Sequence, residues 1–176
     1  MKNTLDAIRD RRSCRAYLPN MITNDELSKI LDAAFLSPSA KNMQRRHLTV
    51  ITNQAYLDEL NIKICAKIDC DPHEYHVFYH APVVVALSSL KGDRWCREDM
   101  GIMIENICLA AESMDIGSVI LGLPQRYFET KEATEDIKKM GAPEDYEPIL
   151  FVSLGYKAQK DIPAKPRDTK RISYIK

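Results

Sequence analysis

The helical part of the segment Asp99–Gly122 restricts the fold more than any other stretch, because nearly every position in it is apolar or small. Its polar residues recur every seven positions, at Asp99, Glu105–Asn106 and Glu112–Ser113, and form one narrow stripe. A surface helix needs only one apolar side, so this helix is expected to be buried around most of its circumference. Either a second copy of the chain covers part of it, or it is an ordinary central core helix.

The composition describes a globular protein with one domain, or a compact one and a half. The chain has 176 residues, of which 45% are hydrophobic and 28% are charged. It has no apolar run of the roughly 18 residues that a membrane helix requires, and its first residues do not resemble a secretion signal. Its five cysteines form no regular framework, which indicates reduced thiols. We therefore expect a cytoplasmic protein that does not bind membranes.

The charge is balanced overall but concentrated in basic segments at the two ends. The formal net charge is zero, yet residues 9–15 carry four Arg against one Asp, and residues 157–176 carry seven Lys or Arg against two Asp. A neutral protein is a poor general binder of nucleic acid, so we expect no nucleic-acid partner. Two basic ends could instead hold one small anion between them.

Hydrophobic periodicity and capping residues predict the other elements. Thr4 is expected to cap a short helix, with Leu5 and Ile8 on its inner face. Thr23 and Glu26 have the spacing of a capping box before a second helix. Further predictions are helices at 56–68 and 132–140, strands at 47–51, 83–87, 118–121 and 149–154, a left-handed helix cap at Gly117, and a linker from Pro124. The strand at 83–87 is apolar throughout, which is typical of burial on both faces.

Two polar segments are candidates for binding a cofactor. The segment Arg11–Arg15 places three guanidiniums and the hydroxyl of Ser13 within five residues, which suits a phosphate. The alternative for this segment is a solvated charge run at the end of a helix. In the loop that follows Pro38, the amides of Asn42 and Gln44 could pair with the edge of a heterocycle, or could simply stabilise a turn.

Residues of metal-binding types gather after the third predicted helix. Cys70, His73, His76 and His80 carry thiol and imidazole groups of the kind that bind zinc, and His76 and His80 have the i, i+4 spacing of one helical face. Neither Cys70 nor the upstream Cys65 belongs to a CxxC pair, and a proline interrupts the local geometry. We assign no metal ligand from the sequence and keep this cluster as an alternative.

The order of these segments resembles that of a known family. Arg11–Arg15 is similar to the Arg-Arg-Ser-x-Arg signature of the nitroreductases that depend on flavin mononucleotide (FMN). The sequence SPSAKNMQ at 37–44 resembles their Ser/Ala-Pro-Ser-x-x-Asn-x-Gln loop. Looser similarities follow at 78–82, 120–122, 154–156 and 165–167, in the expected order along nearly the whole chain. Arg45-Arg46 departs from the Pro-Trp that family members often have after the loop.

This resemblance implies an α+β fold of the small single-domain type, with a mixed central β-sheet flanked by helices. It also implies an intertwined homodimer with two flavins at the interface. Residues 1–156 would form a nitroreductase-like core domain. Residues 157–176 contain prolines and scattered charges that do not build a packed element, and would form an extended C-terminal arm on the partner subunit.

The same resemblance implies which residues bind FMN. The phosphate would be held by Arg11, Arg12, Ser13, Lys165 and Arg167, a loop of the partner subunit would contribute Pro38, Ser39, Asn42 and Gln44, and Ile120, Leu121 and Gly122 would run beside the ring. Arg15 would lie near the pyrimidine edge, where its charge tunes the flavin. No side chain is expected to act as nucleophile or proton relay, because the flavin carries the chemistry.

The implied activity is that of an FMN-dependent oxidoreductase with a ping-pong mechanism. It would pass electrons from NADH or NADPH through flavin to a nitroaromatic, a quinone or a similar small acceptor. The chain has no GxGxxG motif, which agrees with a nicotinamide that stacks on flavin and has no Rossmann site of its own. One alternative is a redox sensor or carrier without turnover, which would bind either flavin or a metal at Cys70, His73, His76 and His80. The other is a reductive dehalogenase or a flavin-processing enzyme on the same fold.

Overall fold

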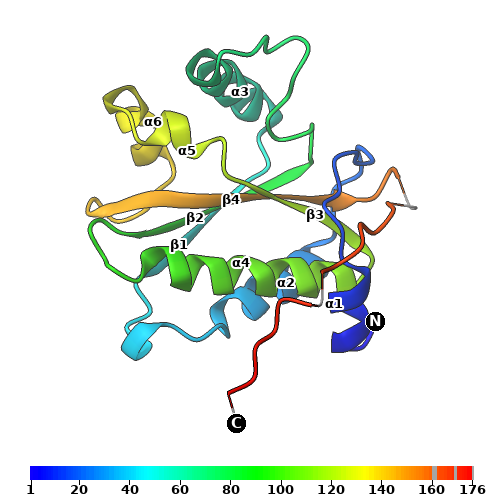
Figure 1. Cartoon of the computed structure of the whole chain (residues 1–176). Helices are drawn as coiled ribbons and strands as arrows, with labels where there is room; N and C mark the ends of the chain where they lie inside the picture. Colours follow the sequence, from blue (N-terminus) through cyan, green and yellow to red (C-terminus); the bar gives the residue numbers. More distant parts are fainter. Residues whose placement is uncertain (160–161, 169, 176) are drawn as a thin grey trace.

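The computed structural model contains a four-stranded β-sheet with helices on both of its faces (Figure 1). The structure describes residues 1–159, 162–168 and 170–175. The strands are β1 (Arg46–Ile51), β2 (Val83–Leu90), β3 (Ile116–Leu121) and β4 (Tyr146–Tyr156), in the sheet order β1-β2-β4-β3. All three pairings are antiparallel, so among the described residues the parallel part of the expected mixed sheet is one isolated bridge, Ser13 to Ser118. The predicted α+β class is confirmed.

Two groups of helices cover the sheet. They are α1 (Thr4–Asp10), α2 (Asn24–Phe35), α3 (Gln54–Ile68), α4 (Cys96–Ser113), α5 (Gln125–Phe128) and α6 (Thr134–Lys139), with 3₁₀ turns at Ala40–Asn42 and Lys131–Ala133. Helices α4 and α2 lie on one face with α1 beside them, whereas α3, α5 and α6 lie on the other (Figure 1). None of the described helices is both long and apolar enough to cross a bilayer.

Strand β2 lies between β1 and β4, and its apolar run is buried on both faces, as the sequence predicted. Val83, Val85 and Leu87 belong to the core beside α4. Val84 and Ala86, which alternate with them, belong to the core beside α3. Because successive side chains of a strand face opposite sides, one uninterrupted apolar run fills both cores.

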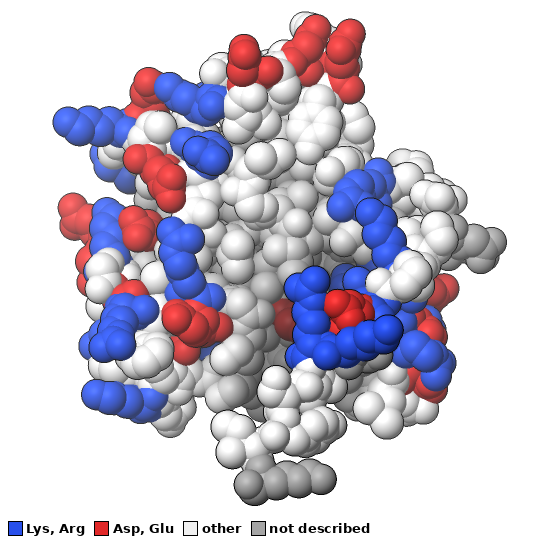
Figure 2. Space-filling view, in the orientation of Figure 1, with Lys and Arg blue, Asp and Glu red and all other residues white. Residues whose placement is uncertain are grey.

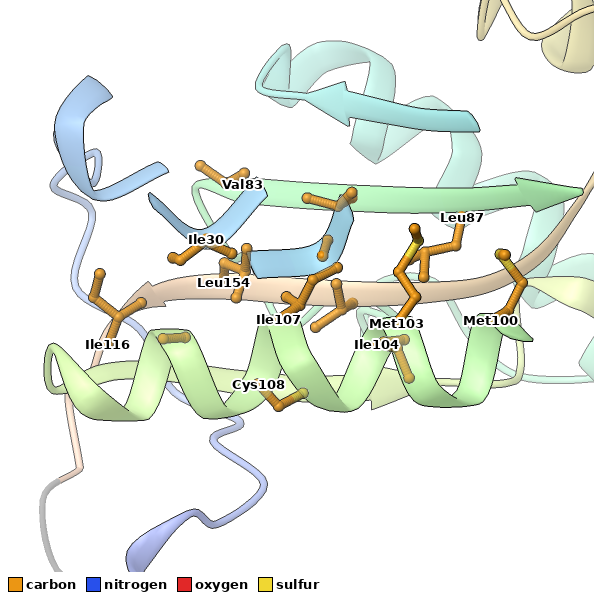
Figure 3. Packing of buried hydrophobic residues seen from close by; sticks show 14 of the residues in the cluster. Ile30, Val83, Leu87, Met100, Met103, Ile104, Ile107, Cys108, Ile116 and Leu154 are labelled. Atoms are coloured by element: carbon orange, nitrogen blue, oxygen red, sulfur yellow. The ribbon is translucent and has the colours of Figure 1, made fainter. Parts of the chain in front are cut away.

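Helix α4 packs one broad face on the sheet. Met103 and Ile107 lie in one cluster with Leu154 of β4 (Figure 3). On the other side of the helix, Ile102 is 43% exposed and Leu109 is partly exposed. A single chain therefore does not enclose this helix around most of its circumference, which counts against an ordinary central core helix and leaves the alternative in which a second copy of the chain covers part of it.

Gly117 does not end α4, so that prediction is wrong. The helix ends at Ser113, and Asp115 adopts the left-handed backbone conformation (φ 62°). Gly117 lies inside β3, where a Cβ atom would come within 2.7 Å of Cys14 Sγ. Glycine is needed there because another segment of the chain approaches the strand closely.

The N-terminal helix also differs from its prediction. Asn3, rather than Thr4, caps α1 by accepting a hydrogen bond from the backbone N–H of Asp6 (2.9 Å). Leu5 and Ile8 are 76% and 53% exposed and do not face the core of this chain. Leu5 and Ile8 do share one side of this helix, but in a single copy of the chain that side is exposed.

The predicted capping box of α2 is confirmed, whereas the predicted linker is wrong. Thr23 Oγ1 accepts the backbone N–H of Glu26 (3.2 Å), and the Glu26 carboxylate accepts the backbone N–H of Thr23 (2.8 Å). After Pro124 the chain does not form a linker but enters α5 at once, and Tyr127 of that helix is buried.

One buried carboxylate joins the helices on the α3 side of the sheet. Asp136 of α6 is only 1% exposed. It accepts hydrogen bonds from Tyr127 Oη (2.6 Å), Lys63 Nζ (2.9 Å) and Tyr56 Oη (3.2 Å). Burial by itself would raise the pKa of Asp136, but the hydrogen bonds from Tyr127 and Lys63 outweigh it and hold the pKa below its usual value. Helices α3, α5 and α6 thus share one anchor.

Asp136→Ala should lower the free energy of unfolding by about 2–4 kcal/mol, because it leaves Tyr127 Oη and Lys63 Nζ without this acceptor. The neighbouring Glu135 is exposed, so Glu135→Ala should change stability by no more than about 0.5 kcal/mol. Urea denaturation at pH 7 measures both values. Equal effects of the two substitutions would contradict the anchoring role of Asp136.

The same anchor should depend on pH in one direction. Since the pKa of Asp136 is lowered by folding, its stabilising effect is present above the ordinary Asp pKa of about 4 and is lost as pH falls through the lower folded value. The stability difference between the unmodified chain and the Asp136→Ala variant should therefore shrink when urea titrations are repeated at successively lower pH below about 4. A difference that grows with acidification would contradict this sign.

Candidate functional site

The polar stripe of α4 holds the segments that carry the predicted site. Near the start of the helix, both carboxylate oxygens of Asp99 accept the backbone N–H of Ala40 (3.0 and 3.2 Å). Midway along it, Glu105 lies 3.6 Å from Nε of Arg11. Near its end, Glu112 forms two ion pairs with lysines. These attachments are six and seven residues apart, which corresponds to about 9 and 10 Å along the helix axis, so the stripe sets the distances between them.

Glu112 connects the N-terminus and the start of the C-terminal arm to the end of α4. Its side chain is 3% exposed and lies 2.6 Å from Lys2 Nζ and 2.8 Å from Lys157 Nζ. Lys157 also pairs with Asp115 (3.1 Å). A buried carboxylate requires such partners, because burial of an unpaired charge is costly.

The segment 13–18 lies beside β3 and the end of β4. Ser13 forms a parallel bridge with Ser118, and the Cys14 N–H donates to the Ser118 carbonyl (2.9 Å). Tyr17 Oη donates to the Cys14 carbonyl (2.8 Å). Cys14 is fully buried, and burial raises the pKa of its thiol, so it is a packing residue and not a reactive thiolate.

Arg15 and the end of β3 form the open part of this region. Ser13 bridges Ser118 within β3, and Ile120 lies two residues further along that strand. The Arg15 guanidinium carbon is 5.9 Å from the centroid of the Tyr79 ring, which fits a cation–π contact. Ile120 is 41% exposed, and a Cβ atom on Gly122 would meet nothing within 4 Å. The region therefore combines an exposed guanidinium with an apolar strand end whose backbone is accessible.

The predicted ring-side residues are therefore not equivalent. Ile120 presents its side chain to solvent, whereas the side chain of Leu121 is 6% exposed and belongs to the core beside α3. Leu121 could reach a ligand only through its backbone. Gly122 is exposed and offers backbone alone.

The three arginines at 11–15 differ in what they are free to bind. The Nη1 group of Arg12 donates to the carbonyls of Arg9 and Arg11 (2.7 Å each) and so closes α1. Its buried Nε has no partner in the described part of the chain. Among the described residues, the one polar contact of the Arg11 side chain is the long one with Glu105 noted above, and Arg15 is exposed. Arg11, Ser13 and Arg15 are therefore the donors best placed to receive a ligand.

The loop at 38–44 is fixed by its own polar side chains. Ser39 Oγ accepts the backbone N–H of Gln44 (3.0 Å), and Gln44 Nε2 donates to Asn42 Oδ1 (2.9 Å). Lys41, Asn42 and Gln44 all have positive φ angles, between 52° and 53°. Within one chain these amides stabilise a turn, and Pro38 is exposed.

The arginines that depart from the family pattern are both engaged within the chain. Arg46 Nη1 donates to the Ser37 carbonyl (2.9 Å), and its Nη2 donates to the Phe35 carbonyl (2.6 Å). Arg45 lies 3.5 Å from the Asp93 carboxylate. Arg46 thus anchors the loop to the end of α2, and neither guanidinium is left without an intramolecular contact.

One chain does not bring the loop and the basic segment together. The loop is attached near the start of α4 at Asp99, whereas the segment after α1 meets the middle of that helix through Arg11 and β3 through Ser13 (Figure 1). Helix α4 has 18 residues and is therefore about 27 Å long. Beside the loop, an open apolar groove of about 400 Å³ is lined in part by Pro38, Trp95 and Ile102.

The described residues of the C-terminal arm form neither helix nor strand and are mostly exposed. Lys165 and Arg167 are exposed, and among the described residues no hydrogen bond or ion pair joins either one to Ser13 or Arg15. Figure 2 shows Lys and Arg side chains gathered around acidic ones on the side of the molecule where α1 and the arm lie.

The residues of metal-binding types between 70 and 80 are not arranged as the sequence alternative required. His76 and His80 do come together, but in a turn rather than a helix, and their neighbour is Asp58 of α3. Cys70 and His73 are not part of this group. Sequence reasoning missed Asp58 and the Tyr79 contact with Arg15, because neither partner is close in sequence and no local pattern marks them.

The chain matches known proteins over most of its length. The sequence profile of the Nitroreductase family matches residues 8–156. A protein from Archaeoglobus fulgidus, provisionally named NADH dehydrogenase/NAD(P)H nitroreductase, is 33% identical over 173 residues, which cover 92% of this chain and 90% of that protein. A nitroreductase with bound FMN from Bacteroides fragilis superposes with a TM-score of 0.90 at 29% identity. One with bound FMN from Desulfitobacterium hafniense gives 0.89 at 28% identity, and both structures are covered completely, as is this chain.

The attachment of the loop to α4 can be tested by hydrogen exchange. Asp99→Asn should speed amide exchange at Ala40 by roughly tenfold or more, because a hydrogen bond to a charged acceptor contributes about 1.5–3 kcal/mol. Glu98 also lies in the first turn of α4 and is exposed, so Glu98→Gln is the matched control and should leave Ala40 unchanged. Unaltered exchange at Ala40 in the Asp99 variant would remove this residue from the account of the loop.

Proposed function

The chain belongs to the nitroreductase family, and from that premise we propose that it is an FMN-dependent oxidoreductase that uses NADH or NADPH as electron donor. The observation that carries the proposal is the bridge that seats Ser13 on Ser118 of β3, the strand at whose end Ile120 and Gly122 are exposed, together with the exposed Arg15 two residues further along the chain. This placement puts anion-binding donors next to an apolar surface with room above it. A flavin nucleotide has the matching chemistry, a phosphate joined to a flat ring.

The donor set of this region fits an FMN phosphate. Arg11 and Arg15 offer guanidinium forks, and Ser13 adds a hydroxyl. Lys165 and Arg167 of the arm would complete the phosphate site, and Arg12 would support it mainly by holding the end of α1. Bound FMN would supply the chemistry itself, accepting a hydride from a reduced nicotinamide and passing electrons to a second substrate.

Arg15 would act as an electrostatic tuner. A guanidinium held beside the ring stabilises negative charge that develops there and so favours two-electron transfer. The contact with Tyr79 limits the positions that the Arg15 side chain can take, and preorganised charge is more effective than mobile charge. Ile120 and Gly122 would keep the ring surface apolar and accessible.

We further propose that a complete site requires two copies of the chain. Among the described residues no hydrogen bond or ion pair joins the loop that carries Pro38, Ser39, Asn42 and Gln44 to Arg11, Ser13 or Arg15, so a loop from a partner subunit would have to supply them. Exposed apolar side chains on α1 and α4, together with the exposed described residues of the arm at 163–168 and 170–175, offer surface for that partner. Burial of these side chains would also account for the apolar circumference of α4.

One open surface supports a ping-pong mechanism. The chain has no GxGxxG motif for a separate dinucleotide, so donor and acceptor would occupy the same face of the site in turn. The acceptor class we propose is a nitroaromatic, a quinone or a similar flat molecule that stacks in the same place.

Absorbance of the purified chain loaded with FMN tests the proposal. NADH or NADPH should bleach the flavin bands under anaerobic conditions, and addition of a quinone should restore them. Bound flavin that neither nucleotide reduces would indicate a carrier, and failure to bind FMN would defeat the proposal entirely.

Arg15→Ala should slow hydride uptake about tenfold or more and weaken FMN binding, because it removes the charge beside the ring. Arg9→Ala is the matched control, since Arg9 is an exposed arginine of α1 that pairs with Asp6 and Asp10. Stopped-flow reduction of the flavin-loaded variants gives the rates. Equal rates for the two variants would refute the role of Arg15.

Truncation after Ile162 tests the arm while it keeps Lys157 on Glu112. The shortened chain should retain its fold but dissociate more readily and lose FMN affinity, since it lacks Lys165 and Arg167. Light scattering across a dilution series and flavin titration measure these effects. Unchanged dimerisation together with full FMN affinity would exclude the arm from both interactions.

A further inference from the structure

Three side chains with metal-binding atoms converge outside the region proposed for the flavin. Asp58 comes from α3, and His76 and His80 come from the turn that precedes β2. One ligand atom from each residue lies within 4.8 Å of those of the other two. His76 Nε2 is 3.1 Å from Asp58 Oδ1, and the two imidazole centroids are 4.0 Å apart.

We propose that Asp58, His76 and His80 bind a divalent transition-metal cation of the zinc type. Two imidazoles and one carboxylate favour such a cation over Mg²⁺ or Ca²⁺, which prefer oxygen ligands alone. Zinc bonds of about 2.0–2.2 Å place two tetrahedral ligand atoms about 3.4 Å apart, close to the separation of Nε2 and Oδ1 here. Three protein ligands leave one position for water or a small exogenous ligand.

The backbone that carries His76 is held in place from two sides. Asn61, one turn beyond Asp58 on α3, accepts the Val77 N–H through Oδ1 (2.8 Å). On the other side, Ser153 Oγ of β4 donates to the Phe78 carbonyl (3.0 Å). The His76 side chain is only 8% exposed, so its ring has little freedom to turn away from Asp58. A binding site of this kind is largely preorganised.

His80 supplies the accessible ligand. Its backbone N–H donates to His76 Nδ1 (3.3 Å), while its own ring forms no hydrogen bond with any described residue. That contact leaves the His76 proton on Nε2, directed at Asp58. A cation would replace this proton between His76 Nε2 and Asp58 Oδ1, and the proton would move to His76 Nδ1. Protonated Nδ1 no longer accepts a hydrogen bond, so the long contact with the His80 N–H would be lost.

The simpler explanation of this group is a hydrogen bond between Asp58 and His76 that fixes the turn on α3. That explanation gives no role to the His80 ring or to a cation. It also differs from the alternative drawn from the sequence, in which Cys70 and His73 would be ligands. Substitutions that separate these three cases are available at exposed positions, because Asp58, His73 and His80 are all exposed.

The test is titration of the full-length chain, without a histidine tag and after removal of metals with a chelator. Calorimetry with Zn²⁺ should show one bound ion per chain, and Mg²⁺ should show none. His80→Ala and Asp58→Ala should each weaken Zn²⁺ binding at least about tenfold, since even groups outside the ligand shell change metal affinity by about 10–100-fold. His73→Ala and Cys70→Ser are the matched controls and should bind Zn²⁺ as the unmodified chain does.

Cobalt gives a second readout that does not depend on heat. Co²⁺ bound by this chain should show ligand-field bands without the near-ultraviolet charge transfer of a thiolate ligand, and His80→Ala should lose those bands. Absence of Zn²⁺ binding, or binding that His80→Ala leaves intact, would overturn the proposal. Loss of binding in Cys70→Ser or His73→Ala, or a thiolate signal with cobalt, would assign the metal to the other set. None of these measurements needs flavin, so their failure is distinct from failure of the proposed function.

Discussion

The packing of α4 against the sheet is the constraint on which the rest of the structure depends. Its apolar face is buried against β2 and β4, which fixes the direction in which its polar stripe points. Asp99 then receives the loop after α2, Glu105 faces Arg11, and Glu112 holds both Lys2 and Lys157. The helix therefore acts as a rigid spacer, and segments that are far apart in the sequence take their positions from one stripe.

This spacing has a direct consequence for function. The loop around Ser39 is attached to the helix at Asp99, the Arg11 guanidinium lies at Glu105, about 9 Å further along the axis, and Lys2 is attached at Glu112, about 20 Å from Asp99. Exposed apolar side chains also lie on these helices, among them Ile8 of α1 and Ile102 of α4. A site assembled from the ends of two different helices, one in each subunit, satisfies both observations.

Features that depend on local sequence were predictable. The apolar run of β2 and the Thr23/Glu26 capping box followed directly from residue order, and the Arg11–Arg15 and 37–44 motifs marked the candidate site. Gly117 was misread because a glycine near a helix end is commonly a cap, whereas here it makes room for Cys14, a contact that depends on the tertiary fold. Asp58 carried no local signal for the same reason.

The most direct test of the central claim, that each site needs two chains, is the activity of an isolated heterodimer. One subunit would carry Arg11→Ala with Arg15→Ala, and the other Ser39→Ala with Asn42→Ala, each with a different removable tag. With FMN present at a level where neither parent oxidises NADH, the heterodimer should recover about half of the unmodified activity, because one of its two sites has all of its residues. A heterodimer no more active than its parents, or a chain that turns over NADH as a monomer, would contradict the account.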